Sequence, residues 1–239
     1  HNIVHTLGCI LHQYSGCGCR NGMDSMMQDY KKRLFELALS KGNLSFGSFT
    51  LKSGRISPYF FIAGGFDDGA SLGALASCYA DSIVDAGLRF DMLFGPAYKG
   101  IPLAAATAIA LHENHGRNVS YAFNRKEAKD HGEGGQIVGA ALSGEVLIID
   151  DVISAGTSVR ESIAIISAAG AVPAGIVIAL DRQERGKGEL SAAQEVHRDY
   201  GIPCTSIAGL DDLIRFLEES GNIAIDLQAI QRYREDYGT

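Results

Sequence analysis

The chain has 239 residues, of which 46% are hydrophobic and 21% charged, so it is long enough to bury one full core. Its formal net charge of -7 argues against nucleic acid as the main partner, because a phosphate backbone demands a basic surface. Small anionic ligands remain compatible with this charge, since helix N-termini can hold them within an acidic protein. We therefore expect one α/β domain that binds small molecules.

The first 22 residues differ from the rest of the chain. They hold three of the cysteines, but the spacing matches no standard zinc pattern and no second Cys/His pair follows. They also lack a basic stretch followed by a sustained apolar run, so a signal peptide is not expected. We expect residues 1–22 to be a non-native or disordered extension, and residues 23–239 to form a single domain.

The odd number of cysteines indicates reduced thiols and hence a cytoplasmic enzyme. The five cysteines are Cys9, Cys17, Cys19, Cys78 and Cys204.

The first predicted element is an amphipathic helix over residues 28–40, which Gly42 can end. Short strand-like runs follow around residues 46–51 and 58–62. A second helix is expected over residues 71–86, with Gly87 after it, and residues 92–95 then form a short buried strand.

The middle of the chain continues with a helix over residues 101–114 and a strand over 119–123. Residues 125–135 form the one long polar segment, and we expect a loop there, because long loops inside a compact domain are usually functional. Residues 145–150 contain four consecutive aliphatic side chains, which is typical of a strand that is buried on both faces. The next helix is expected over residues 157–169.

The last third contributes a strand over residues 174–180, further elements at 191–200 and 204–207, and helical patterns from 211 to 236. Repeated strand–helix–strand units with apolar strands indicate a central parallel sheet that is flanked by helices.

Residues 162–180 carry no charge and are nominally long enough to cross a bilayer. Gly170, Pro173 and Gly175 interrupt this segment, so a helix followed by a buried strand explains it better. No membrane span is expected.

The clearest chemical signal is the turn after the strand at 145–150. The strand ends in Asp150 and Asp151, and small residues then lead into a helix. Ligands of open α/β sheets bind outside the carboxyl ends of the strands. Free backbone N–H groups and the helix dipole favour a phosphate there, and two carboxylates suit ribose hydroxyls. An ordinary strand-to-helix turn with an Asp or Ser/Thr cap would give the same pattern.

This turn resembles the signature of type I phosphoribosyltransferases, which bind 5-phosphoribosyl 1-diphosphate (PRPP). The family pattern is an aliphatic strand, an Asp-Asp pair and a turn with Ser or Thr, Gly and Thr. The resemblance implies that Asp150 and Asp151 hold the ribose hydroxyls and that the turn holds the 5-phosphate. It also implies the type I fold, with a small hood subdomain from the N-terminal region and a flexible catalytic loop.

Four further segments, at residues 49–61, 93–102, 124–134 and 180–184, closely resemble bacterial-type orotate phosphoribosyltransferases. The likeness runs from about Asp29 to the end of the chain. It implies transfer of the phosphoribosyl group of PRPP to orotate, giving orotidine 5′-monophosphate and pyrophosphate in pyrimidine biosynthesis.

The resemblance also implies roles for individual residues. The PRPP-binding set is Lys52, Tyr98, Lys99, Arg125, Lys126, Lys129, His131, Asp150, Asp151, Val152, Ile153, Ser154, Ala155, Gly156, Thr157 and Ser158. The orotate-binding set is Lys52, Phe60, Phe61, Ser154 and Arg182. The catalytic set is Lys99, Lys129, His131, Asp150 and Asp151. Mg²⁺ is expected to be held mainly by pyrophosphate and ribose oxygens, with Asp150 and Asp151 nearby. A homodimer that shares the catalytic loop between subunits is also implied.

Taken singly, most of these residues have simpler explanations. Residues 125–133 alternate in charge like a solvated loop, and Phe60 and Phe61 would usually be core residues. Only their joint occurrence favours orotate transfer. The alternatives are a phosphoribosyltransferase for another base, against which Phe60, Phe61 and Arg182 argue, and a PRPP-binding regulator of the same fold. A regulator of that kind should carry a basic nucleic-acid-binding region, and the net charge is negative.

Overall fold

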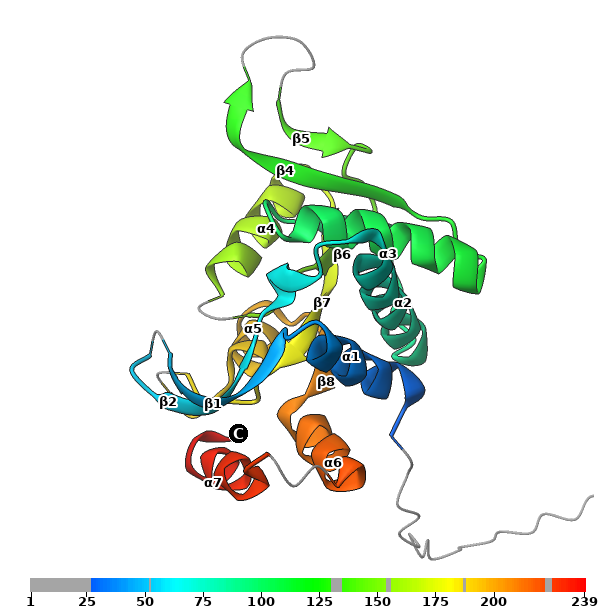
Figure 1. The fold of residues 1–239 in the computed structure, drawn as a ribbon. Coiled ribbons are helices and arrows are strands. Elements are labelled where there is room, and N and C mark those ends of the chain that lie inside the picture. Colours follow the sequence, from blue (N-terminus) through cyan, green and yellow to red (C-terminus); the bar gives the residue numbers. More distant parts are fainter. Residues whose placement is uncertain (1–26, 52, 130–134, 154–155, 187, 222–224) are drawn as a thin grey trace, which may run out of the picture.

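The computed structural model describes residues 27–51, 53–129, 135–153, 156–186, 188–221 and 225–239, so the predicted extension at 1–22 lies outside the described residues. The main feature is a six-stranded sheet in the order β5-β4-β3-β6-β7-β8 (Figure 1). Its strands are β3 (Met92–Gly95), β4 (Ser120–Lys129), β5 (Gly135–Gly139), β6 (Glu145–Ile149), β7 (Val172–Asp181) and β8 (Cys204–Gly209). All neighbouring pairs are parallel except β4 and β5, which are antiparallel.

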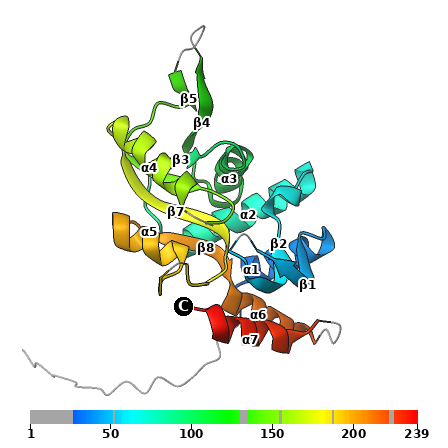
Figure 2. The same ribbon diagram turned by 90° about the vertical axis from the view of Figure 1, so that its left-hand side faces the viewer.

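Helices cover both faces of this sheet (Figure 2). One face carries α1 (Asp29–Ser40), α2 (Gly69–Asp85) and α3 (Gly100–His115), and the other carries α4 (Thr157–Ala168) and α5 (Ala192–Tyr200). The central strand β6 shows why the sheet needs both layers. Leu147 and Ile149 belong to the core on the α2–α3 side, whereas Val146 and Ile148 belong to the core on the α4 side. Consecutive strand residues point to opposite faces, so an all-aliphatic strand is stable only between two layers.

A second, two-stranded sheet lies apart from the main one. It is the antiparallel hairpin of β1 (Leu44–Thr50) and β2 (Ile56–Phe61). The hairpin packs against α7 (Leu227–Tyr237), where the rings of Tyr59 and Tyr233 meet edge to face with centroids 6.4 Å apart. This small unit occupies the place of the predicted hood.

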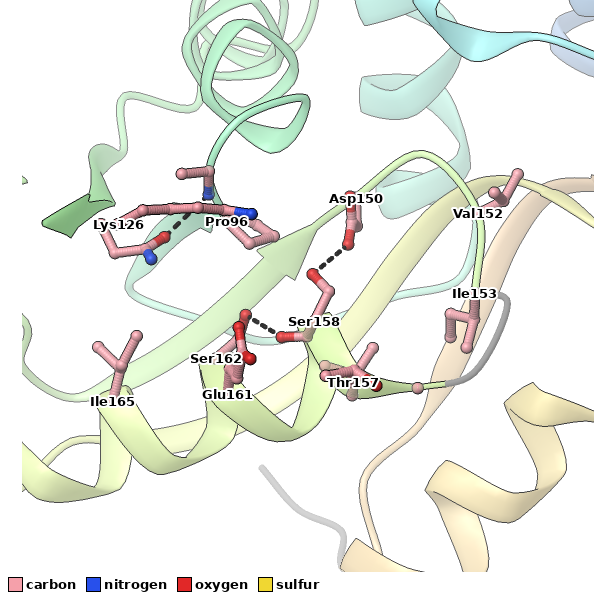
Figure 3. A pocket seen from close by; sticks show the side chains of 14 residues that line it. Pro96, Lys126, Asp150, Val152, Ile153, Thr157, Ser158, Glu161, Ser162 and Ile165 are labelled. Carbon is pink, nitrogen blue, oxygen red and sulfur yellow. Dashed lines mark hydrogen bonds between the residues drawn. The ribbon is translucent and has the colours of Figure 1, made fainter.

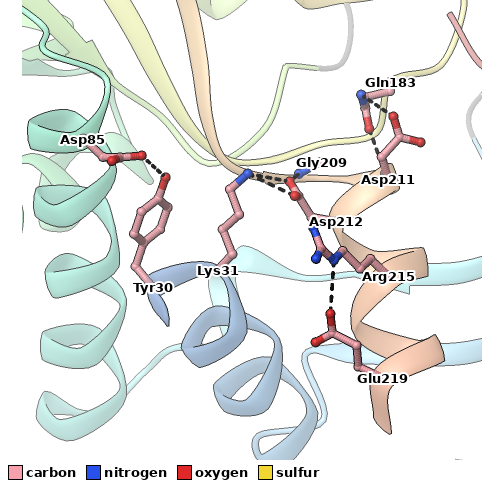
Figure 4. Close-up of polar contacts among 9 residues, drawn as sticks. All are labelled: Tyr30, Lys31, Asp85, Gln183, Gly209, Asp211, Asp212, Arg215 and Glu219. Carbon is pink, nitrogen blue, oxygen red and sulfur yellow. Dashed lines mark hydrogen bonds and ion pairs between the residues drawn. The ribbon is translucent and has the colours of Figure 1, made fainter. Parts of the chain in front are cut away.

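Polar contacts join α1 both to α2 and to the C-terminal part of the domain (Figure 4). The Tyr30 hydroxyl donates to Asp85 of α2 at 2.9 Å. The Lys31 ammonium binds both carboxylate oxygens of Asp212, on α6 (Leu210–Ser220), at 3.0 and 3.1 Å. Residues that are far apart in the sequence therefore form one unit around the same core.

The predicted elements agree with the structure to within a few residues at their ends, with one clear exception. The predicted loop at 125–135 is wrong over its first five residues, because β4 continues to Lys129 and returns antiparallel through β5 from Gly135. This hairpin projects from the body of the domain (Figure 1). Lys126 and Glu127 are exposed, so the strand carries the charge pattern of a solvated loop.

The uncharged segment at 162–180 is divided between α4 and β7, as the sequence indicates. Among the described residues, every helix falls short of the length or apolar character that a bilayer crossing requires.

Candidate active site

The strand order places a crevice between β3 and β6. The chain leaves β3 toward β4 on one side, and it returns to β6 on the other side before continuing outward to β7 and β8. The loops that follow β3 and β6 therefore diverge, which is the point where open α/β sheets bind ligands. The loop after β3 contains Tyr98 and Lys99, and the turn after β6 begins with Asp150 and Asp151.

Both carboxylates of the acidic pair are buried, each residue being 7% exposed. Asp150 accepts from the backbone N–H of Asp151 at 2.9 Å and from the Ser158 hydroxyl at 2.8 Å. The buried hydroxyl of Tyr79, on α2, donates to the Asp150 main-chain carbonyl at 2.8 Å. Asp150 is thus held by the helix behind the sheet and by the helix in front of it.

Burial raises the pKa of the Asp150 carboxyl to about 6. The hydrogen bonds from Ser158 and from the Asp151 N–H act in the opposite direction, and the charge of Asp151 adds to the increase. The turn therefore holds a carboxylate whose charged form is destabilised by burial, although the charge of Lys99 favours it. Hydroxyl donors or a cation would stabilise it.

Lys99 supplies the nearest positive charge. Its Nζ lies 2.6 Å from the Asp151 carboxylate and joins the two loops across the crevice. The loop reaches β6 because Gly95 and Gly100 lack side chains: a Cβ on Gly100 would lie 2.8 Å from the Ile149 carbonyl, and one on Gly95 would lie 2.1 Å from the Gly100 carbonyl.

The turn leads into the N-terminus of α4. Gly156 adopts a left-handed φ of 67° and precedes the helix without a side-chain cap among the described residues. The start of α5, by contrast, is closed by reciprocal hydrogen bonds between Ser191 and Gln194. An uncapped helix start with glycine is a suitable cradle for a phosphate, because the first backbone N–H groups need acceptors.

A cavity of about 310 Å³ lies over this turn (Figure 3). Its lining residues come from the loop after β3, from β4, from the acidic turn and from α4. They are Pro96, Ala97, Asn124, Lys126, Asp150, Val152, Ile153, Gly156, Thr157, Ser158, Val159, Glu161, Ser162 and Ile165. The structure thus brings most of the predicted turn residues, and Lys126, to one cavity.

Strand β4 forms another wall of the site. The side-chain oxygen of buried Asn124 accepts from the Ala97 N–H at 2.9 Å, which ties β4 to the loop that carries Tyr98 and Lys99. The Lys126 ammonium lies 5.3 Å from the ring centroid of exposed Tyr98. Arg125 is half-buried on the same strand. The cationic side chain of Lys126 therefore lies beside the loop after β3.

Phe60 and Phe61 follow one another on β2 and have different environments. The Phe60 ring is 38% exposed and stacks on Phe49 at 5.6 Å, while Phe61 is half-buried against Phe66. Because consecutive strand residues point to opposite faces, the two rings cannot both face one ligand. The backbone is what the pair can offer to the same ligand.

Arg182 follows the last residue of β7 at the same carboxyl edge of the sheet. Its Nε donates to Glu184 at 2.8 Å, its Nη2 donates to the Ser57 hydroxyl at 2.9 Å, and its guanidinium lies 4.2 Å from the Tyr59 ring centroid. Arg182 thereby links the main sheet to the β1–β2 hairpin.

Several predicted residues cannot be placed. Lys52, His131, Ser154 and Ala155 lie outside the described residues, and the side chain of Lys129 is not described although its backbone ends β4. Within the described part of the chain, no group of three or more His, Cys, Asp or Glu side chains could hold a metal ion.

Sequence reasoning missed Tyr79 and Asn124. Tyr79 has the spacing of a core aromatic on a helix, and nothing in the sequence distinguishes its hydroxyl. Asn124 directly precedes the predicted polar segment, where an amide side chain looks solvated. The close approach at Gly95 and Gly100 could have been inferred, since both glycines flank a short loop directly after a buried strand.

Comparison with known proteins agrees with this geometry. Residues 67–200 match the model of the phosphoribosyl transferase domain. The orotate phosphoribosyltransferase of Thioalkalivibrio sulfidiphilus is 60% identical over 212 residues, covering 89% of this chain and all of the relative. The Salmonella newport enzyme of the same name is 58% identical with the same coverage.

The crystal structure of orotate phosphoribosyltransferase from Francisella tularensis superposes with a TM-score of 0.78 and 41% identity, covering 86% of this chain and 98% of that one. The fold and the crevice are those of a phosphoribosyltransferase. With relatives of this identity and coverage, the chain belongs to the orotate phosphoribosyltransferase family.

Proposed function

We propose that this chain transfers the phosphoribosyl group of PRPP to orotate, giving orotidine 5′-monophosphate and pyrophosphate in pyrimidine biosynthesis. The observation that carries the proposal is the buried acidic pair at the switch point of the sheet. The pair precedes the turn into α4, and Asp151 lies 2.6 Å from the Lys99 ammonium. The names of relatives 58–60% identical support the same reaction.

The acidic turn suits the sugar. Asp150 and Asp151 can accept hydrogen bonds from the ribose 2- and 3-hydroxyls, because a carboxylate is an acceptor only. We assign the 5-phosphate to the backbone N–H groups and hydroxyls of the segment from Val152 to Ser158, because it leads into a helix N-terminus. This assignment uses the cavity over the turn as the ribose 5-phosphate site.

The leaving group requires positive charge. As the bond from C1 of the ribose to the pyrophosphate oxygen breaks, C1 becomes cationic and the oxygen becomes more negative. Cationic groups placed at that oxygen stabilise the transition state more than the ground state. The proposed residues are Lys99 and Tyr98 on the loop after β3, Arg125, Lys126 and Lys129 on β4, and His131 beyond it.

The electron pair that forms the new bond comes from the deprotonated ring nitrogen of orotate. No covalent enzyme intermediate is needed, because C1 exchanges one bond for another. We assign the orotate carboxylate to Arg182, and we assign the ring edge to the backbone at Phe60 and Phe61. Lys52 and Ser154 complete the proposed base site.

We propose Mg²⁺ as the cofactor, bound mainly through PRPP. The residues present fit it, because the acidic pair offers hard oxygen ligands. When bound, the ion would neutralise charge on the pyrophosphate.

A homodimer that shares the catalytic loop, and a cytoplasmic location, are part of the same proposal. The β4–β5 hairpin projects from the body of the domain, where it is accessible to a second subunit (Figure 1). Mixed dimers of complementary variants test the sharing. The location is supported by Cys78 and Cys204, which are free thiols in the described part of the chain.

The proposal is tested with a panel of bases. The purified chain, Mg²⁺ and PRPP are incubated with orotate, uracil, adenine or hypoxanthine, and pyrophosphate release is measured. We expect release with orotate alone. Release with a purine and none with orotate would overturn the substrate, and PRPP binding without turnover of any base would favour a regulator.

A further inference from the structure

The three residues after β7 form a strained turn that the proposed chemistry does not explain. Gln183 lies between Arg182 and Glu184 and has a φ of 50°, which is the left-handed region that side-chain-bearing residues rarely adopt. Such conformations persist only where the surroundings hold them, and they concentrate at functional sites.

Two separate parts of the chain hold this turn. The Gln183 side chain accepts from the Asp211 N–H at 2.9 Å and donates to the Asp211 carboxylate at 3.3 Å (Figure 4). The Gln183 carbonyl accepts from the Thr239 N–H at 3.0 Å, and Gly238 pairs with Glu184 as an isolated bridge. Asp211 at the start of α6 and the C-terminal residues Gly238 and Thr239 thus hold one short turn.

The consequence lies in the two flanking side chains. Glu184 is turned back onto Arg182, where one carboxylate oxygen accepts from Nε and also pairs with Nη2. Ser57 on β2 accepts from the same Nη2 at 2.9 Å, and the Tyr59 ring covers the guanidinium. The Nε–Nη2 edge of Arg182 is therefore occupied by protein groups.

We propose that Glu184, held by the strained turn, is a positioning residue that locks Arg182 so that its remaining amino group, Nη1, meets the carboxylate of the base. This inference rests on the proposed function, because it takes Arg182 as the group that reads that carboxylate. A guanidinium offers its donors in a rigid plane, so fixing Nε and Nη2 also fixes the direction of Nη1.

A different role for Glu184 would be competition. If Glu184 had to leave Arg182 before the base could bind, removing its charge would strengthen binding. The turn argues for a fixed role. Asp211 and Thr239 hold Gln183, and Gly238 pairs with Glu184, whereas a carboxylate that must swing away does not need the turn that carries it to be held in this way.

The test is Glu184→Gln, which keeps the shape and removes the charge. We expect the KM for orotate to rise about 10-fold, as loss of a charge-assisted hydrogen bond implies, and the KM for PRPP to stay within about 2-fold. The matched control is Glu189→Gln, since Glu189 has a side chain 90% exposed and pairs only at 3.8 Å with Arg185. We expect wild-type values for the control.

A second variant addresses the support of the turn without changing its charges. A Cβ on Gly238 would lie 2.4 Å from the Arg234 carbonyl, so Gly238→Val must displace the segment that pairs with Glu184. We expect this variant also to raise the orotate KM selectively. If a thermal unfolding control shows that Glu184→Gln does not fold, the orotate KM of Gly238→Val tests the proposal in its place.

An orotate KM that is unchanged or lower in Glu184→Gln overturns the proposal, as does an equal rise of both KM values. If the wild-type chain does not turn over orotate, the proposed function fails, and equilibrium binding of orotate then separates the two ideas. Weaker binding to Glu184→Gln than to wild type would still support positioning, whereas equal or absent binding would overturn it.

Discussion

Asp150 is 7% exposed at the end of β6, and burial raises the pKa of its carboxyl to about 6. A carboxyl whose pKa is higher in the folded chain than its ordinary value of 3.8 binds protons more tightly when folded. Its contribution to stability is therefore present at low pH and is lost as the pH rises through about 6. The fold keeps this costly charge where the proposed ribose hydroxyls need an acceptor.

Asp150→Asn removes this carboxyl, so its gain in stability over wild type should be largest at high pH. We expect the free energy of unfolding of Asp150→Asn, relative to wild type, to be about 2–3 kcal/mol more favourable at pH 8 than at pH 4. Chemical denaturation in metal-free buffer at both pH values measures this difference. The same variant should lose PRPP binding. A stability difference that does not change with pH would show that Asp150 is not strained by burial.

Individual site residues could be predicted where they sit in a recognisable local pattern. Asp150, Asp151, Gly156 and Ser158 come together because they occupy one turn. Tyr79 and Asn124 were missed, because their roles depend on elements that meet only in the fold. Tyr79 reaches the Asp150 carbonyl from α2, and no spacing in the sequence joins those two positions.

At the scale of elements, α2 supports the acidic turn through a single hydroxyl. Tyr79→Phe leaves the buried Asp150 carbonyl without this donor, which should cost about 1–2 kcal/mol of unfolding free energy. We expect the KM for PRPP to rise about 3- to 10-fold, because a displaced turn should lose roughly 1 kcal/mol of binding free energy for PRPP. Steady-state kinetics and chemical denaturation measure the two effects.

The matched control is Tyr30→Phe. The Tyr30 hydroxyl also donates to a carboxylate of α2, but this carboxylate belongs to Asp85 at the C-terminal end of the helix, more than one turn beyond Tyr79. It should lose stability and keep its PRPP kinetics. Equal KM values in the two variants would mean that Tyr79 does not position the turn.

The same scale shows where sequence patterns succeed and fail. Strand β6 could be predicted because its four aliphatics need burial on both faces. The β4–β5 hairpin could not, because its polar strand extends beyond the body, where side chains meet solvent rather than a second layer. Periodicity reports burial, so it does not report a strand that lacks burial.

For the whole molecule, the sequence pattern does not predict the order of the strands in the sheet. Spacing predicts parallel strands but does not say that β6 returns beside β3, and that return is what creates the crevice. We propose that residues 23–239 form a single phosphoribosyltransferase domain. Deleting residues 1–22 should leave kcat and both KM values within about 2-fold and the unfolding free energy unchanged within about 0.5 kcal/mol. A larger loss of turnover would show that the extension contributes.

The most direct test of the central claim is the stoichiometry of the reaction. With Mg²⁺ and PRPP, the purified chain should consume orotate, measured by its absorbance, and release one pyrophosphate for each orotidine 5′-monophosphate formed. Lys129→Ala should lower kcat by roughly 10²-fold, as loss of a charge contact in the transition state implies. Pyrophosphate release that leaves orotate unconsumed would contradict the account.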